Sequence, residues 1–467
     1  MPELEPGSFR DRNGRVFYRD NRVFRTLSAE SLANWKILEK KRFFVEALDQ
    51  GSIVGTRLAG VCDLPPEISS GNWAAILEHQ KIPFISYPYE WSFDMLKDAA
   101  LLQLNLLHKA LQEEMILKDA SSFNIQWRGA RPVFIDIPSF ERLRKGQIWV
   151  GYRQFCRLFL YPLLLQAYKN VPFQPWLRGS VDGIAPEHCN AFMSRRDRLR
   201  SGVLTHVYLQ ARLQARYGAT RENIRGQLKG AGFRKELILH NVKALQKLVG
   251  SLKWEPRRSE WSDYGCRDSY SEEDRKAKTD FVRQVAAQRH WPLVWDLGCN
   301  VGRFSRIAAE NAASVVALDG DHLTINRLYR ELKSGNNQTI LPLIFNLADP
   351  SPSLGWRCLE RRGLLDRGRP DLTLCLALIH HLVISANIPL DEILSWLGSL
   401  GGDLVIEFVT KQDPMVETLL RNKDDQYREY ELECFERCLG QEFELLKRTT
   451  LRSRTRVLYH ARSRKQV

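Results

Sequence analysis

The sequence predicts an α/β protein built from two unlike domains, and three observations support this. After residue 271, β-like apolar runs alternate with amphipathic segments, which is typical of an open parallel sheet with crossover helices. A charged stretch without periodicity, residues 254–268, precedes that region. The part before the charged stretch mixes short β-like runs with long helical periodicity, which favours an α+β domain.

These patterns divide the chain into four segments. We expect an α+β domain over residues 1–190, a basic helical extension over 191–253, a linker over 254–268 and an α/β domain over 269–467. A chain of 467 residues is long enough for two or three domains with sizeable cores.

In the first half, short β-like runs lie on both sides of a turn at Asn21. A helix is expected over residues 29–49, and a long amphipathic helix follows Trp91. Most of residues 150–250 has helical periodicity. The predicted strands of this half are Val16–Tyr18, Val23–Leu27, Ile53–Leu58 and Phe84–Tyr87.

The second half opens with a predicted helix over about 271–288, because Ser271 and Asp274 have the spacing of an N-terminal cap and apolar residues then recur at helical intervals. The last two β-like runs, Phe443–Leu451 and Arg456–His460, have no helix between them and predict an antiparallel hairpin. The strands expected before the hairpin are Leu293–Asp296, Val315–Asp319, Ile340–Asn346, Leu372–Ala377 and Leu404–Val409.

The positive charge of the chain is concentrated in two segments. The formal net charge is +14, and residues 191–260 contain 16 Lys and Arg against 5 Asp and Glu, while residues 440–467 contain 8 against 2. Such segments attract nucleic acid, phosphorylated substrates or anionic surfaces, or they are simply solvated helix faces and an exposed hairpin.

The sequence also bears on the compartment. Residues Met1 to Glu5 contain no basic stretch followed by an apolar run, so no signal peptide is expected. No segment reaches the roughly 20 apolar residues of a membrane span, and the nine cysteines are scattered without a CxxC pair. We therefore predict a cytoplasmic protein with reduced thiols, no membrane span and no metal site.

One run in the second half carries the clearest chemistry. An apolar strand ends in Asp296, a turn containing Gly298 and Gly302 follows, and a helix begins. Glycines in such a turn let the backbone approach a ligand closely. A second acid, Asp319, closes the next β-like run about 20 residues later, where it can accept both ribose hydroxyls of a nucleoside.

This combination resembles the first two motifs of class I S-adenosylmethionine-dependent methyltransferases, with Asn300 at the place of the middle glycine. The resemblance covers about residues 271–467, including the closing hairpin. It implies a Rossmann-like sheet of seven strands and S-adenosyl-L-methionine as the cofactor.

The resemblance also implies which residues hold the donor. The turn would line the methionine and ribose portion, Asp319 would bind the ribose hydroxyls, and a residue after the third strand would lie near the adenine amino group. These cofactor-binding candidates are Asp296, Gly298, Asn300, Gly302, Asp319 and either Asn346 or Asp349.

Three residues are candidates for catalysis. His380 and His381 follow the fourth strand at the carboxyl edge, where open sheets bind ligands, and either could remove a proton from the acceptor. Glu407 ends the fifth strand at the same edge. The runs ALIHHL and EFVTKQDPMVETLL, which contain these residues, are similar to a bacterial group of nodulation-related methyltransferases, which suggests a saccharide or lipid-linked saccharide as acceptor.

The first half contains a second motif. Asp119 and Asn124 lie five residues apart, and Asp136 closes a β-like run 12 residues later. This spacing is similar to the catalytic loop of protein kinases and aminoglycoside phosphotransferases, in which such residues orient the acceptor and hold Mg²⁺. A glycine-rich phosphate loop is absent, and Arg25 is the nearest basic residue to the usual lysine. The alternative is an acceptor-binding domain whose Asp and Asn residues shape a turn.

The sequence thus predicts methyl transfer from S-adenosylmethionine to a hydroxyl of a saccharide, lipid-linked or other small acceptor. One alternative is a bifunctional kinase–methyltransferase that binds Mg-ATP through the Asp119 motif. Another is an RNA methyltransferase that uses the basic helices. N-methylation of bases is disfavoured, because the Asn/Asp-Pro-Pro-Tyr tetrad typical of that reaction is absent after the fourth strand.

Overall fold

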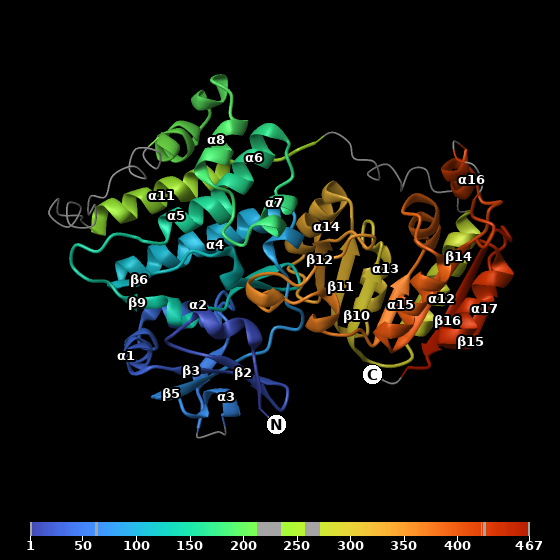
Figure 1. Cartoon of the computed structure of the whole chain (residues 1–467), viewed down its shortest axis with the longest axis horizontal. Coiled ribbons are helices and arrows are strands. Elements are labelled where there is room, and N and C mark those ends of the chain that lie inside the picture. Colours follow the sequence, from blue (N-terminus) through green and yellow to red (C-terminus); the bar gives the residue numbers. More distant parts are fainter. Residues whose placement is uncertain are drawn as a thin grey trace. The chain divides into compact units, whose positions relative to one another are not determined.

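The structure is a computed structural model that describes residues 2–60, 64–212, 235–256, 271–421, 423 and 426–465. The chain divides into two compact units (Figure 1). The first comprises Met1–Trp127, Pro132–Pro256 and Ser353–Arg361, and the second Arg128–Arg131, Arg257–Pro352 and Arg362–Val467. Most of the predicted linker lies outside the described residues.

An antiparallel sheet of five strands opens the first unit, in the order β1-β2-β3-β5-β4. Asp20 and Asn21 join β2 to β3 with positive φ angles of 49° and 60°, as a tight hairpin turn requires. One face of this sheet is covered by an apolar cluster in which Phe17 stacks on Phe24. The strands are β1 (Glu3–Leu4), β2 (Val16–Arg19), β3 (Arg22–Leu27), β4 (Thr56–Leu58) and β5 (Ala75–His79).

The single helix expected over residues 29–49 is wrong, because two helices occupy that stretch. Helix α1 spans Ala29–Leu38 and α2 spans Arg42–Asp49. The Glu113 carboxylate accepts hydrogen bonds from the backbone N–H groups of Arg42 and Phe43, at 3.0 and 2.7 Å. This distant side chain satisfies the first amides of α2 and so stabilises a new helix start.

The expected strand Phe84–Tyr87 is also wrong, and Ala75–His79 forms the strand instead. The side-chain amide of Gln126 bonds both backbone groups of Ser86, at 2.9 Å each, and takes the place of a neighbouring strand. Of the expected strand Ile53–Leu58, only the end is β4, and Ile53 forms an isolated bridge.

The rest of the first unit is mainly helical, as predicted. The long buried helix α4 (Phe93–Gln112) begins at Ser92, whose hydroxyl caps it. Two small antiparallel pairs follow, β6 (Met115–Leu117) with β9 (Phe140–Arg142) and β7 (Ile125–Arg128) with β8 (Arg131–Phe134). The remaining described α-helices are α3 (Pro66–Ser69), α5 (Tyr152–Phe155), α6 (Tyr161–Lys169), α7 (Gln174–Gly179), α8 (Pro186–Phe192) and α11 (Lys235–Ser251).

A sheet of seven strands forms the centre of the second unit, in the order β12-β11-β10-β13-β14-β16-β15. The first five strands in this order are parallel, and the last two are antiparallel to their neighbours. The predicted parallel sheet and closing hairpin are confirmed. The strands are β10 (Trp291–Leu297), β11 (Ala312–Asp319), β12 (Ile340–Ile344), β13 (Leu372–Cys375), β14 (Asp403–Val409), β15 (Phe443–Thr450) and β16 (Arg456–Ser463).

Helices flank this sheet (Figure 1). Helix α12 begins after Ser271, whose hydroxyl caps the Asp274 amide as predicted. Across the described residues, no helix combines the length and the apolar character that crossing a bilayer requires. The helices of the second unit are α12 (Glu272–Ala286), α13 (Arg303–Ala309), α14 (His322–Ser334), α15 (Leu390–Leu400), α16 (Pro414–Leu420) and α17 (Leu432–Glu442).

Candidate active site

A turn with three left-handed residues connects β10 to α13. Gly298 and Gly302 have φ angles of 72° and 73°, and Asn300 between them has a φ of 49°. Asparagine tolerates this conformation better than most side chains, which explains how Asn300 replaces the middle glycine. The turn is tied to the neighbouring strand because the amides of Gly298 and Cys299 donate to the Leu318 carbonyl, at 2.8 and 3.0 Å.

The two acids of the motif lie on either side of this turn. Asp319 ends β11, and its carboxylate accepts hydrogen bonds from the amides of Asn300 and Asp321, at 2.9 Å each. Asp296 is 2% exposed, and its carboxylate accepts a hydrogen bond of 2.5 Å from the Ser305 hydroxyl. Two parallel strands that end at one edge therefore bring Asp296, Asn300 and Asp319 to the same place.

The charge on these acids is poorly compensated. Burial raises the pKa of Asp296 to about 6, against the hydrogen bond from Ser305, and the charge of Asp319 contributes. Burial also raises the pKa of Asp319, although two backbone amides oppose the shift. Among the described residues, no Lys or Arg forms an ion pair with either carboxylate. Such a site is suited to a ligand that brings positive charge and hydroxyl groups.

The third strand ends earlier than predicted, at Ile344. Asn346 lies in the turn that follows, where its side-chain oxygen accepts a hydrogen bond of 3.0 Å from the Ala348 amide. Both Asn346 and Asp349 are exposed. Asn346 shapes the turn and leaves its NH₂ group as the hydrogen-bonding end of the side chain.

His380 and His381 lie beyond β13, with ring centroids 4.2 Å apart. His380 is fully buried, and burial together with the charges of His381, Arg456 and Lys278 keeps its pKa well below the usual value. Neither ring nitrogen of His380 has a partner among the described residues. His381 is partly exposed, and burial lowers its pKa to about 4. Both imidazoles are neutral near pH 7.

Ala377, on the way to these histidines, has a φ of 51°. A non-glycine residue in this conformation is strained by about 1 to 2 kcal/mol. Such strain is tolerated where the surrounding structure holds a loop in place. The strained residue, Ala377, lies in the segment between β13 and the two histidines.

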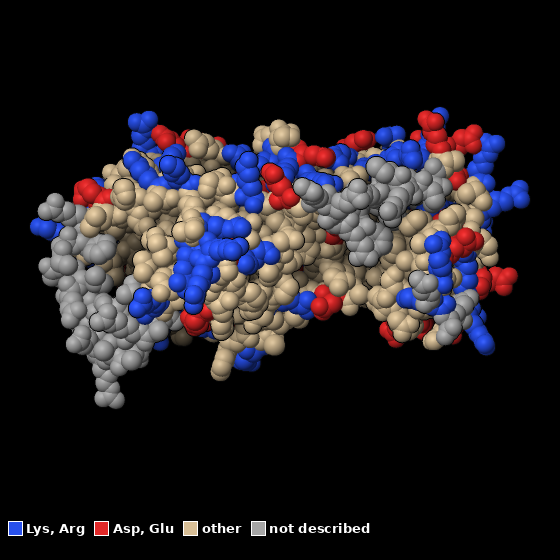
Figure 2. Space-filling view, turned by 90° about the horizontal axis from the view of Figure 1, so that it is seen from above, with Lys and Arg blue, Asp and Glu red and all other residues tan. Residues whose placement is uncertain are grey.

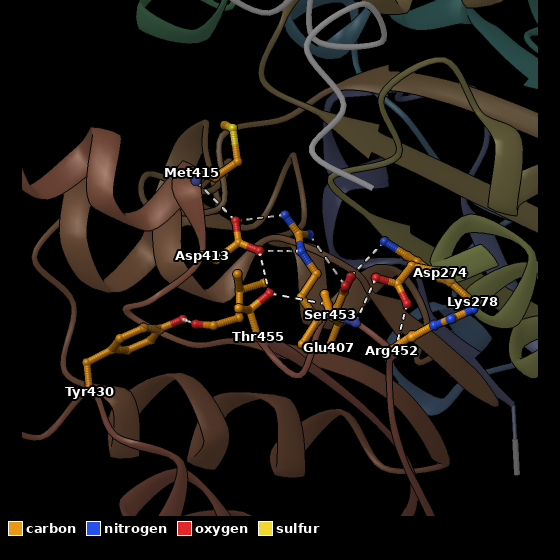
Figure 3. Close-up of polar contacts among 11 residues, drawn as sticks. Asp274, Lys278, Glu407, Asp413, Met415, Tyr430, Arg452, Ser453 and Thr455 are labelled. Atoms are coloured by element: carbon orange, nitrogen blue, oxygen red, sulfur yellow. Dashed lines mark hydrogen bonds and ion pairs between the residues drawn. The ribbon is translucent and has the colours of Figure 1, made fainter. Parts of the chain in front are cut away.

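Glu407, the third catalytic candidate, belongs to a buried cluster of charges (Figure 3). Its carboxylate is fully buried and lies 2.6 Å from Lys278 Nζ and 3.5 Å from Arg456 Nη1. Arg456 also bonds both carboxylate oxygens of Asp413, at 2.7 and 3.0 Å. We call Lys278, Glu407, Asp413 and Arg456 the buried charge cluster. Its ion pairs link α12, β14 and β16.

Lys278 and Arg456 are not among the residues that the sequence predicted for the site. A signal for Lys278 existed, because it lies three and four residues before Phe281 and Val282 and so falls on the apolar stripe of α12. A lysine on that stripe must find an acid in the interior. Arg456 gave no such signal, since its two acidic partners are far away in the sequence. Within the described ranges, no group of three His, Cys, Asp or Glu side chains is arranged to hold a metal ion.

The fold and the site together define the class of the protein. An antiparallel seventh strand lies between the fifth and sixth, a glycine turn follows the first strand, and an acid ends the second. These features define a class I S-adenosylmethionine-dependent methyltransferase.

The comparison with known sequences is more specific. The chain is 33% identical to the Nodulation protein NoeA of Rhizobium meliloti (strain 1021) over 465 residues, which cover 98% of this chain and 96% of the relative. The protein therefore belongs to the NoeA family. No model of a described protein family matches the chain.

Solved methyltransferase structures also align with part of the chain. The N-methyltransferase NodS from Bradyrhizobium japonicum WM9 is 11% identical, with a TM-score of 0.31, and the alignment covers 42% of this chain and 99% of NodS. Magnesium protoporphyrin IX methyltransferase (ChlM) from Synechocystis PCC 6803, with bound S-adenosylhomocysteine, is 19% identical, with a TM-score of 0.30 and coverages of 44% and 96%.

Proposed function

We propose that the protein transfers the donor methyl group to a hydroxyl of a saccharide, a lipid-linked acceptor or another small acceptor. The observation that carries this proposal is the partly exposed imidazole of His381, which lies beyond the carboxyl end of β13. A hydroxyl loses its proton when it is methylated, and a neutral imidazole can accept that proton. The relative is named a nodulation protein, which is compatible with such an acceptor. The cytoplasm is the compartment in which we propose this reaction.

The geometry of the two acids supports the donor-binding roles that we propose. S-adenosylmethionine supplies an electrophilic methyl group on a sulfonium. Asp319 would accept the ribose hydroxyls, because its carboxylate is fixed by two backbone amides. Asp296, with Gly298 and Gly302, would line the methionine and ribose portion. The NH₂ group of Asn346 or the exposed carboxylate of Asp349 would lie near the adenine.

We propose His381 as the base in preference to His380. His381 is partly exposed, whereas His380 is fully buried beside the two cations of the buried charge cluster. A positive charge on His380 would be costly there, because the side chain is buried and two cations are already close. His381→Ala should lower kcat by about 100-fold or more with donor affinity unchanged. The matched variant His380→Ala should retain more activity, and equal losses in both would contradict this assignment.

The first experiment is a melting titration of the full-length protein with S-adenosylhomocysteine and, separately, with Mg-ATP. A ligand that binds only the folded state raises Tm. We expect S-adenosylhomocysteine to raise Tm, and Asp296→Asn to reduce that rise. No shift with S-adenosylhomocysteine would overturn the donor assignment.

A second proposal concerns the first unit, for which we infer a kinase-like fold. Two helices lie between β3 and β4, and a long helix then precedes the Asp119 loop, as in a kinase small lobe and catalytic loop. Asp136 accepts bonds from Arg25 at 2.5 Å and from Asn124 at 3.2 Å. Burial and the nearby Asp136 raise the pKa of Asp119.

This geometry favours a site that does not transfer phosphate. The Arg25 guanidinium holds one carboxylate oxygen of Asp136, so a Mg²⁺ ion would have to displace an ion pair. The residues therefore do not fit a resident metal. We expect Mg-ATP to leave Tm unchanged, and an increase that disappears in Asp136→Asn would instead support the bifunctional enzyme.

A further inference from the structure

Four large apolar side chains are exposed within one short stretch of the first unit. Leu199 is 91% exposed, and Phe192, Leu204 and Leu209 are 39%, 48% and 44% exposed. Single exposed leucines are common, but several close together on a folded surface indicate an interaction site. We call residues 192–212 the arginine–leucine surface.

The same stretch is strongly basic. It contains five arginines, at positions 195, 196, 198, 200 and 212, and its single acid is Asp197. Asp197 is 4% exposed and accepts bonds from Lys169 Nζ at 2.9 Å and from the Ser194 hydroxyl at 2.7 Å. These bonds hold the pKa of Asp197 below its usual range. The acid thus fixes the loop from inside, and the charge presented to solvent is positive.

Contacts with tyrosine rings hold three of the arginines, Arg198, Arg200 and Arg212. The Arg198 guanidinium lies 4.0 Å from the Tyr208 ring centroid, and that of Arg212 lies 5.8 Å from the same ring. Arg200 lies 4.9 Å from the Tyr168 ring and bonds the Tyr168 carbonyl. Figure 2, seen from the side on which α8 lies in Figure 1, shows Lys and Arg side chains gathered on this face.

We propose that the arginine–leucine surface docks the protein on an anionic lipid bilayer. Guanidinium groups form paired hydrogen bonds with the phosphates of lipid headgroups. Exposed leucine and phenylalanine side chains gain free energy by entering the boundary between headgroups and acyl chains. A nucleic acid would use the same arginines but would gain nothing from Leu199, so the mixture of the two residue kinds favours a membrane. The proposal is independent of the methyl acceptor.

The test is co-sedimentation of the full-length protein with phosphatidylcholine vesicles, with and without one quarter phosphatidylglycerol. We expect binding to the anionic vesicles only, and weaker binding as salt is raised. Leu199→Glu should weaken binding about tenfold or more, because it replaces the exposed leucine that would enter the bilayer by a charged side chain. The double variant Arg195→Glu/Arg196→Glu should weaken binding by about tenfold or more through charge.

Matched variants keep this test specific. Val45→Glu changes an exposed apolar side chain on α2, and Lys36→Glu/Lys40→Glu reverses two exposed charges near α1. Both should bind vesicles like the wild type, and the Tm of every variant should match the wild type. Equal binding by Leu199→Glu and wild type would overturn the proposal. So would failure to bind anionic vesicles, or RNA binding that needs the arginines but not Leu199.

Discussion

The carboxyl edge of the seven-stranded sheet carries acids in two regions, one at β10 and β11 and one at β14, and their charges are neutralised differently. Asp296 and Asp319 accept hydrogen bonds from a hydroxyl and from backbone amides, whereas Glu407 and Asp413 lie against Lys278 and Arg456. The negative charge of Asp296 and Asp319 is thus not balanced by an ion pair among the described residues, whereas that of Glu407 and Asp413 is. A cationic ligand would therefore gain most binding energy beside Asp296 and Asp319. The acids beside Lys278 and Arg456 already have their counter-charges.

The ion pairs of Glu407 also make it a poorer candidate for catalysis. A carboxylate that is fully buried and paired with two cations is poorly placed to take a proton from an acceptor. We therefore expect Glu407 to position Lys278 and Arg456, and not to act as the base. Replacing Glu407 together with Lys278 separates these two roles.

The largest effect is expected for Lys278→Met. Removing the lysine breaks its 2.6 Å ion pair with the buried Glu407 carboxylate, which keeps Arg456 at the longer distance of 3.5 Å. Breaking a buried pair costs about 3 to 5 kcal/mol. Urea unfolding measures this loss. Lys276→Met, which changes an exposed lysine on the same helix, should leave the free energy of unfolding nearly unchanged.

The double variant Lys278→Met/Glu407→Leu sharpens the result. Replacing both charges by apolar groups should recover much of the lost stability. A stable double variant that still methylates would show that Glu407 has a structural role. A stable but inactive double variant would indicate that Glu407 takes part in catalysis.

The second prediction is a pH dependence of the free energy of unfolding that comes from Asp296. The folded-state pKa of Asp296 is about 6, above the usual 3.8, so its protonated form favours the folded state. Its contribution to stability is present below pH 4 and is lost as the pH rises through 6. The loss is at most about 3 kcal/mol. Asp296→Asn cannot titrate, so the difference in free energy of unfolding between the two proteins should change over this range. A constant difference would contradict the raised pKa.

The sequence predicted those parts of the fold and site that depend on local pattern. The glycine turn, the acid that ends β11 and the closing hairpin are all visible in periodicity and spacing. The break between α1 and α2 was not visible, because Glu113, which starts the second helix, is 70 residues away. The partners of Glu407 were hidden for the same reason. Side chains that are distant in the sequence determine both features, and the periodicity of a single sequence does not predict such contacts.

The third prediction tests the donor end directly. Asp319→Ala removes the acceptor proposed for the ribose hydroxyls and should weaken binding of S-adenosylhomocysteine by roughly 1.5 to 3 kcal/mol, the range for hydrogen bonds to a charged group. Titration calorimetry measures this affinity. Asp321→Asn is the matched control, since an asparagine keeps the cap of α14 and should bind the ligand normally. Unchanged affinity in Asp319→Ala would sink the ribose assignment.

The smallest effects are expected in the glycine turn after β10, which follows Asp296 and contacts Asp319. Gly302 has a φ of 73°, and an added Cβ would lie 2.7 Å from Leu328 Cδ1, so Gly302→Ala should cost about 1 to 2 kcal/mol. Asn300→Gly should be neutral or slightly stabilising, because glycine adopts the same left-handed conformation without strain. Gly440→Ala, inside α17 with open space around the new Cβ, should stabilise by about 1 kcal/mol.

Thermal unfolding of these three variants distinguishes strain in the turn from a general effect of glycine replacement. If Gly302→Ala and Gly440→Ala changed Tm in the same direction, the turn would not depend on its left-handed backbone. With opposite signs, the loss at Gly302 can be compared with the loss of S-adenosylhomocysteine affinity in the same variant. A turn that only supports the fold would lose stability alone, whereas a turn that cradles the donor should lose affinity as well.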